Sequence, residues 1–168
     1  MFAEQLVIAL IADQDPELDA TEQNATHALQ SVVATIQAAQ SDSRVDVVVV
    51  ASRNDEVLAA AHSNDAVNRR IDSVAFGIGG QTAAVQEMLD DGFVDEHSWI
   101  ICLNPQVGST GQISLIERAF EVLQVNPGYS AVTAVEPNTG AELLHLFSAA
   151  AFVESNGLPI RGAVSFLQ

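Results

Sequence analysis

The sequence contains no lysine, and its six basic residues are all arginines. Against them stand 22 acidic residues, which leave a net charge of −16 at neutral pH. Six arginines cannot neutralise an extended track of phosphates, so binding to a nucleic-acid polymer is not expected. The shortage of bases suits a salt-rich cytoplasm or a basic partner. It equally suits a surface that net charge keeps soluble.

Cysteine and long apolar segments are also scarce. Cys102 is the one cysteine, so no internal disulfide can form, and its place in an apolar run predicts an inert core thiol. The longest apolar runs, such as residues 47–51, are too short to cross a bilayer. Glu4 stands where a signal peptide would carry basic residues. We therefore expect a cytoplasmic protein with no signal peptide and no membrane segment.

Complete catalytic motifs are missing as well. The sequence has no Walker A loop, no G-x-G-x-x-G dinucleotide fingerprint and no G-x-S-x-G nucleophile elbow. The four histidines show no spacing that suits a metal site, so we expect each at the surface or half-buried. Hydrolase chemistry in particular has no support in the sequence.

What the chain does have is an alternation of strand and helix patterns. Its 168 residues, 48% of them hydrophobic, suffice for a single domain spanning residues 1–168. Short apolar or β-branched runs predict strands, and apolar residues at helical spacing predict helices. We expect strands at residues 5–12, 45–51, 73–76, 99–103, 131–135 and 163–167, and helices at residues 22–40, 54–61, 81–89, 114–123 and 141–153. This order predicts an α/β fold in three layers, a Rossmann-like, mostly parallel sheet with helices on both faces.

The candidate site lies beyond the carboxyl ends of the strands, where open α/β sheets bind ligands. Four loops leave those ends, at residues 13–22, 52–56, 77–82 and 104–111. The third loop contains Gly79 and Gly80 and opens a helix. Glycines let a ligand approach the backbone, and a helix N-terminus favours an anion. Gly79, Gly80 and Gln81 therefore belong either to a phosphate or nucleotide loop or to a tight strand-to-helix turn.

Two other loops offer carboxylate and amide groups. Asp13 and Asp15 open an acidic loop whose oxygens can bind Mg²⁺ or Ca²⁺. The calcium-loop pattern fails because Leu18 stands where glycine is required, and a solvated acidic loop is the simpler interpretation. Asn104 and Gln106 follow an apolar strand. Their amides can read a base or orient a ligand, or the segment simply ends the strand at a proline.

Short motifs resemble one enzyme family in the same order along the chain. Residues 52–57 (SRNDEV) resemble an S/T-D-D-x-E-I step, and residues 79–85 (GGQTAAV) fall where that family has a small-residue loop that meets the nucleotide. Residues 99–107 (WIICLNPQV) resemble its I-V-x-L-Q-x-x-x-P-L strand and loop. Residues 130–136 (SAVTAVE) and 161–164 (RGAV) resemble two later strands. Taken together, the chain resembles the CMP-sugar synthetases, the cytidylyltransferases that activate sialic acid and Kdo.

The resemblance implies a nucleotide-diphospho-sugar transferase-like fold with a site for CTP or a CMP-sugar. The residues it implies for the nucleotide pocket are Gly79, Gly80, Gln81, Asn104, Gln106 and, as the one nearby cation, Arg53. An active enzyme of this kind would use Mg²⁺, for which Asp13 and Asp15 are the weak candidates. The resemblance also implies a homodimer or another protein partner.

The chain departs from the family pattern where the family binds phosphate. There the first strand is followed by A-R-x-G-S-K-x-x-x-x-K-N, whose basic residues hold the triphosphate. Residues 12–19 (ADQDPELD) bring acids instead, and like charges repel. Asn104 stands near the position of a metal-binding aspartate in related enzymes. The family's last portion would lie beyond Gln168.

These departures predict a truncated, catalytically impaired cytidylyltransferase-like domain that retains binding of a nucleotide or sugar nucleotide. The alternative is a non-catalytic α/β module for protein–protein interaction or assembly. A third interpretation is a flavodoxin-like or receiver-like binding domain, although no lysine exists to complete a receiver's acidic pocket.

Overall fold

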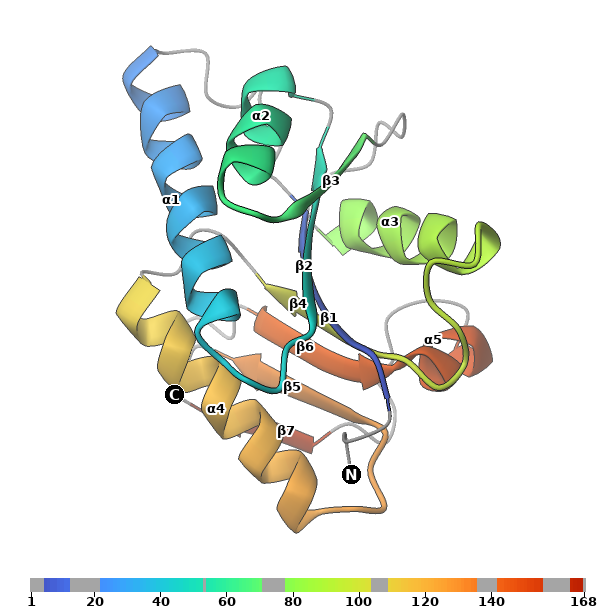
Figure 1. Cartoon of the computed structure of the whole chain (residues 1–168). Helices are drawn as coiled ribbons and strands as arrows, with labels where there is room; N and C mark the ends of the chain where they lie inside the picture. The colour runs from blue at the N-terminus through green and yellow to red at the C-terminus, as the bar shows by residue number, and fades with distance from the viewer. Residues whose placement is uncertain are drawn as a thin grey trace.

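One seven-stranded sheet lies between two layers of helices (Figure 1). The computed structural model describes residues 5–12, 22–52, 54–70, 78–103, 109–135, 142–155 and 164–167. The strands are β1 (Val7–Ala12), β2 (Val47–Ser52), β3 (Val67–Arg70), β4 (Trp99–Leu103), β5 (Ala131–Val135), β6 (Glu142–Ser148) and β7 (Val164–Leu167). The helices are α1 (Glu22–Gln40), α2 (Asp55–Ser63), α3 (Ile78–Asp90), α4 (Ser109–Val125) and α5 (Ala149–Ser155). Within the described ranges, no helix is long and apolar enough to span a membrane.

The strand order is β3-β2-β1-β4-β6-β5-β7. Strands β1, β2, β3 and β4 pair in parallel, and so do β5 and β7. Only β6 among the described strands runs antiparallel to its neighbours, β4 and β5. The prediction of a mostly parallel sheet is therefore confirmed. A flavodoxin-like order, 2-1-3-4-5, does not fit this arrangement.

The alternation of side chains along each strand divides the core into two halves. On one face, side chains such as Ile11 and Leu146 pack against α1, α2 and α4. On the other face, Leu10 and Phe147 pack against α3 and α5, and Phe147 lies against Phe152 with 6.0 Å between the ring centroids. Figure 1 shows the same division, with α1, α2 and α4 on one side of the sheet and α3 and α5 on the other. The three-layer prediction is confirmed.

One predicted helix is wrong. The segment expected to be helical over residues 141–153 forms strand β6 up to Ser148, and only then begins α5 at Ala149. Its apolar residues satisfy both a helical and a strand pattern, because a strand buried on both faces has no polar alternation. Pairing with β4 and β5 decides the outcome, since it places Leu144 and Leu146 on one face and Phe147 on the other.

The strand β3 was not predicted from the sequence. It is an edge strand with the sequence VNRR, and three of its four residues are exposed. Charged residues on an edge strand deter pairing with another chain, but they also remove the apolar signal on which a prediction depends. The weak strand expected at residues 73–76 lies outside the described residues.

Arg44, just before β2, links this part of the chain to helix α4. The guanidinium of Arg44 donates from Nε and Nη2 to the two carboxylate oxygens of Asp42, at 2.9 and 2.8 Å. The same guanidinium lies 4.5 Å from the ring centroid of Phe120, which is fully buried in α4. The carboxylate of Asp42 is only 5% exposed, so its charge depends on this partner.

The replacement Arg44→Ala should lower the free energy of unfolding by about 2 kcal/mol. It leaves the buried carboxylate of Asp42 without its hydrogen-bond partner and removes the cation from the face of the Phe120 ring. Arg44→Lys should lose less, since it keeps the charge but not the two-point hydrogen bond. Burial raises the pKa of Asp42, but the hydrogen bonds from Arg44 outweigh burial and hold that pKa below its ordinary value. Urea unfolding at neutral pH measures the loss for each variant.

The pH dependence of that loss is a second check. Because the folded-state pKa of Asp42 is lowered, the stabilisation is fully present above about pH 4 and is lost as the pH falls through the folded value. The difference between the wild-type chain and Arg44→Ala should therefore be smaller at an acidic pH below about 4 than at neutral pH. A difference that is equal at both pH values would contradict the assigned role of the pair.

Helix α2 has a complete cap at each end. The side chain of Asn54 accepts hydrogen bonds from the backbone N–H groups of Glu56 and Val57, at 2.9 and 3.4 Å. At the other end Asp65 takes a left-handed conformation with φ of 60°, and the N–H of Ala66 donates to the carbonyl of Ala61 at 2.9 Å. Both ends of the helix are thus fixed by local hydrogen bonds.

The replacement Asn54→Ala should cost about 1 kcal/mol of stability, because two N–H groups of the first turn lose their acceptor. Asn54→Ser serves as the matched control, since its hydroxyl can still cap the helix and its cost should be a few tenths of that. Thermal unfolding of both variants by circular dichroism makes the comparison. Equal losses for alanine and serine would show that capping is not what Asn54 contributes.

Candidate functional site

The carboxyl ends of four strands meet along one edge of the sheet. In register, Ala12 at the end of β1 lies beside Ala51 of β2, and Ser52 lies beside Arg70 at the end of β3. Leu103 at the end of β4 pairs with Ile11 of β1. The chain segments that follow these strands must therefore leave from the same edge, which is where the sequence placed the candidate site.

Four helices begin after these strand ends. Helices α1, α2, α3 and α4 each follow a strand of the parallel group, and each leads back to the start of the next described strand. Their N-termini therefore face the edge at which those strands end, and each N-terminus carries a partial positive charge. Helix α5 follows the antiparallel strand β6 and so begins at the opposite edge.

The glycine segment forms the first turn of α3. The helix begins at Ile78 rather than at Gln81, so the backbones of Gly79 and Gly80 are already helical. Any residue can adopt a helical backbone, and each glycine costs up to about 1 kcal/mol relative to alanine there. The two glycines thus have no conformational reason to be present. What they provide is a bare backbone, with N–H groups that have no partner within the helix.

The N-terminus of α2 is already occupied by groups of the chain itself. The hydroxyl of Ser52, a buried residue, accepts a hydrogen bond from the N–H of Asn54 at 2.9 Å. Asn54 in turn caps the helix, and Asp55 and Glu56 place two carboxylates in its first turn. The segment that resembles the S/T-D-D-x-E-I step is therefore a strand-to-helix corner held by its own side chains. It offers an anion little attraction.

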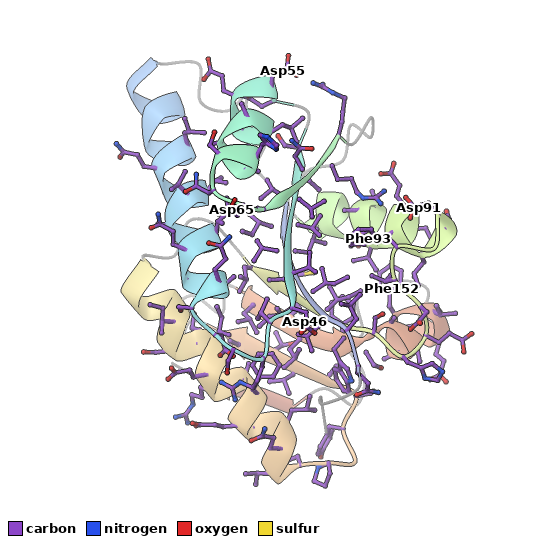
Figure 2. The ribbon with its side chains drawn as sticks, in the orientation of Figure 1. Asp46, Asp55, Asp65, Asp91, Phe93 and Phe152 are labelled. Atoms are coloured by element: carbon purple, nitrogen blue, oxygen red, sulfur yellow. The ribbon has the colours of Figure 1, made fainter. Side chains whose placement is uncertain are left out.

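The two described arginines near this end of the sheet, Arg69 and Arg70, are paired with carboxylates. Arg70 forms an ion pair with Asp55, and Figure 2 shows Asp55 at the start of α2. Arg69 forms an ion pair with Asp91 at 2.6 Å, and its guanidinium lies 5.4 Å from the ring centroid of Phe93. In the described part of the chain, neither arginine of β3 is available as an uncommitted partner for phosphate.

Most of the predicted site residues fall outside the described residues. These are Arg53, Asn104 and Gln106 of the nucleotide pocket, and Asp13 and Asp15 of the weak metal site. Gly79, Gly80 and Gln81 are placed, through their backbones, in the first turn of α3. Over the described ranges, no group of three or more histidine, cysteine or acidic side chains could hold a metal ion.

Sequence reasoning missed a buried polar pair in the sheet. His145 of β6 lies opposite Cys102 of β4 and Thr133 of β5, and its Nδ1 is 3.3 Å from the Thr133 hydroxyl oxygen. His145 is only 7% exposed, contrary to the expectation for the histidines, whereas His62 and His97 are exposed as expected. No spacing in the sequence reveals this pair, because only the pairing of β5 with β6 brings its two residues together.

The thiol of Cys102 behaves as predicted. It is completely buried, and burial raises its pKa well above the ordinary value of a thiol. A thiol that stays protonated is a poor nucleophile and a poor metal ligand, so Cys102 packs as a small apolar side chain.

The fold has close counterparts among solved structures, although no protein-family model matches the sequence and no curated protein matches it. A CMP:2-keto-3-deoxy-manno-octonic acid synthetase complexed with CTP is 12% identical with a TM-score of 0.63, and the match covers 98% of this chain and 90% of that one. The 4-diphosphocytidyl-2C-methyl-D-erythritol synthase of Anaerococcus prevotii is 9% identical with a TM-score of 0.62, over 97% and 89% of the two chains.

A third similar structure is Rv0371c of Mycobacterium tuberculosis in complex with manganese. It is 12% identical, with a TM-score of 0.56 over 98% of this chain and 88% of that one. Identities this low show similarity of the fold alone. Among the described strands of this chain, the sheet is parallel except at β6 and its two neighbours. The chain has a cytidylyltransferase-like nucleotidyltransferase fold.

Proposed function

We propose that this domain binds a nucleotide or sugar nucleotide at the carboxyl edge of β1, β2 and β4, and that it transfers nucleotidyl groups poorly or not at all. The observation that carries the proposal is the pair of glycines in the first turn of α3. Two residues that weaken a helix occupy the start of α3 at this edge, where bare N–H groups would suit a phosphate.

The charges at this edge support binding without efficient transfer. Transfer from CTP requires cations that stabilise the triphosphate as its charge builds up. The chain has no lysine, Arg70 is paired with Asp55, and α2 begins with two carboxylates. A ligand with one or two phosphates would meet less repulsion here than a free triphosphate.

Few residues of this chain are candidates to bind a divalent cation. One similar structure is a complex with CTP and another a complex with manganese. In this chain the described residues hold no cluster of metal ligands, and Asp13 and Asp15 remain the candidates by sequence. Binding is therefore best tested with and without Mg²⁺.

Calorimetric titration should detect binding of CMP or a CMP-sugar to the wild-type chain. Gly79→Val should abolish it, because a branched side chain keeps a phosphate from the backbone N–H groups, while helix propensity is not reduced. Gly128→Val is the matched control, since Gly128 lies outside this edge and a side chain there meets nothing within 4 Å. Binding should survive in that variant.

Two results of the titration would count against the proposal. The absence of heat and of any thermal shift with every nucleotide would favour the alternative, a non-catalytic module for protein–protein interaction or assembly. Equal binding by Gly79→Val and the wild-type chain would show that the start of α3 is not the site.

The transfer reaction itself should be undetectable or very slow. Pyrophosphate release from CTP and Mg²⁺, measured with acidic sugars such as sialic acid or Kdo as acceptors, should stay at the level of a protein-free control. The physical reason is the shortage of cations at the edge of the sheet. Acceptor-dependent release of pyrophosphate well above that level would overturn the impaired-enzyme part of the proposal.

A further inference from the structure

The C-terminal end of α3 concentrates negative charge where a helix tolerates it least. Five carboxylates fall within residues 87–96, and two of them, those of Glu87 and Asp90, lie in the last turn of the helix. That turn contains no basic residue. The C-terminus of a helix carries a partial negative charge, so acids there repel the helix dipole as well as one another.

Among the described residues, one arginine, Arg69, compensates for the negative charge at this end. Arg69 reaches across from β3 to Asp91 at 2.6 Å, and its hydrogen bond holds the pKa of Asp91 below the ordinary value. Figure 2 shows Asp91 and Phe93 together at the end of α3. Asp95 accepts hydrogen bonds from the N–H of His97 and the hydroxyl of Ser98, which orders the turn without neutralising its charge.

These carboxylates do not form a cation site. No group of three or more potential ligands comes together anywhere in the described ranges. The charges are instead spread around the helix end, where Asp90 and Glu96 are exposed. Spread charges respond to the general ionic atmosphere, whose screening length falls from about 30 Å at 0.01 M salt to about 10 Å at 0.1 M.

Helix α4 provides the contrast. It carries Glu117 and Glu121, but Arg118 lies between them in the sequence. The guanidinium of Arg44 also lies close: its hydrogen bond with Asp42 does most to raise its pKa, and the charges of Glu117 and Glu121 raise it further. The acids of α4 therefore have cations nearby, whereas Glu87 and Asp90 have none on their own helix.

The intrinsic helix stability of α3 is low, so it does little to offset the repulsion among the carboxylates at its C-terminal end. It begins with two glycines in its first turn, which weakens helix initiation. Packing against the sheet holds it in place, through the fully buried side chains of Ala84, Val85 and Met88. Its docking is thus a balance between apolar burial and charge repulsion at one end.

We infer that the stability of α3 depends on salt. Monovalent salt stabilises the docked, helical state of α3 more than it stabilises the docked state of α4. Screening acts on the repulsion at residues 87–96 and leaves the apolar contacts in place. The inference concerns the free chain and does not depend on whether a nucleotide binds.

Native-state hydrogen exchange at low and moderate KCl tests this directly. Between about 0.02 M and about 0.5 M KCl, the exchange of α3 amides, corrected for intrinsic rates, should slow about five-fold more than that of α4 amides. Because both helices belong to the same molecule, general effects of salt on the protein cancel in the comparison.

Two double variants remove the same charge from different helices. Glu87→Gln with Asp90→Asn should slow α3 exchange at low salt and abolish most of its salt response, and the asparagine keeps an oxygen for the hydrogen bond from Gln86. Glu117→Gln with Glu121→Gln should leave the salt response of α3 intact. Equal salt responses of α3 and α4, or an α3 response that survives the first double variant, would overturn the inference.

Discussion

The parallel pairing of β1 with both β2 and β4 is the constraint on which the rest of the structure depends. The side chains of residues 7–11 are completely buried, so this strand must be covered by helices on both faces. Parallel neighbours also force each connection to cross from one edge of the sheet to the other. Every chain segment that leaves β1, β2, β3 or β4 therefore starts at the same edge, and the helices begin there. The location of the candidate site follows from burial and connectivity rather than from any single motif.

Cations are few in this chain, and three of the six arginines are already paired with carboxylates. Arg44 stabilises the carboxylate of Asp42 next to Phe120. Arg69 forms an ion pair with Asp91, and Arg70 forms one with Asp55. Each pair does structural work, either by anchoring a helix to the sheet or by covering an edge strand. With half of its six arginines paired in this way and no lysine, the domain has little positive charge left for a triphosphate. The same shortage leaves the end of α3 poorly compensated, so one compositional feature bears on both the site and the stability of the helix that carries it.

The sequence was sufficient for the central strands and for the architecture, and the reasons are specific. β-Branched runs such as residues 47–51 favour strands, and residues 115–123 place apolar side chains on one helical face. It was insufficient at β6, where Leu144, Leu146 and Phe147 fit helix and strand alike until their partners are known. It also failed at β3, whose two arginines carry no strand signal, and at the His145–Thr133 pair, which only strand pairing brings together. Of the site residues, Gln81 was expected at a helix start, whereas Gly79 and Gly80 were expected in a loop and instead form the first turn of α3, because glycine is compatible with either backbone. Arg53, Asn104 and Gln106 stay predictions.

The most direct test of the account is a nuclear magnetic resonance titration of the isotopically labelled chain with CMP. Amide shifts should gather at the start of α3, at Gly79 and Gly80, and at the neighbouring ends of β1, β2 and β4. The indole N–H of Trp99, which donates to Gln5 at the opposite edge of the sheet, should stay unchanged. Shifts concentrated at that opposite edge, or no shifts at millimolar nucleotide, would contradict the claim that this fold keeps a nucleotide site at the carboxyl ends of its strands.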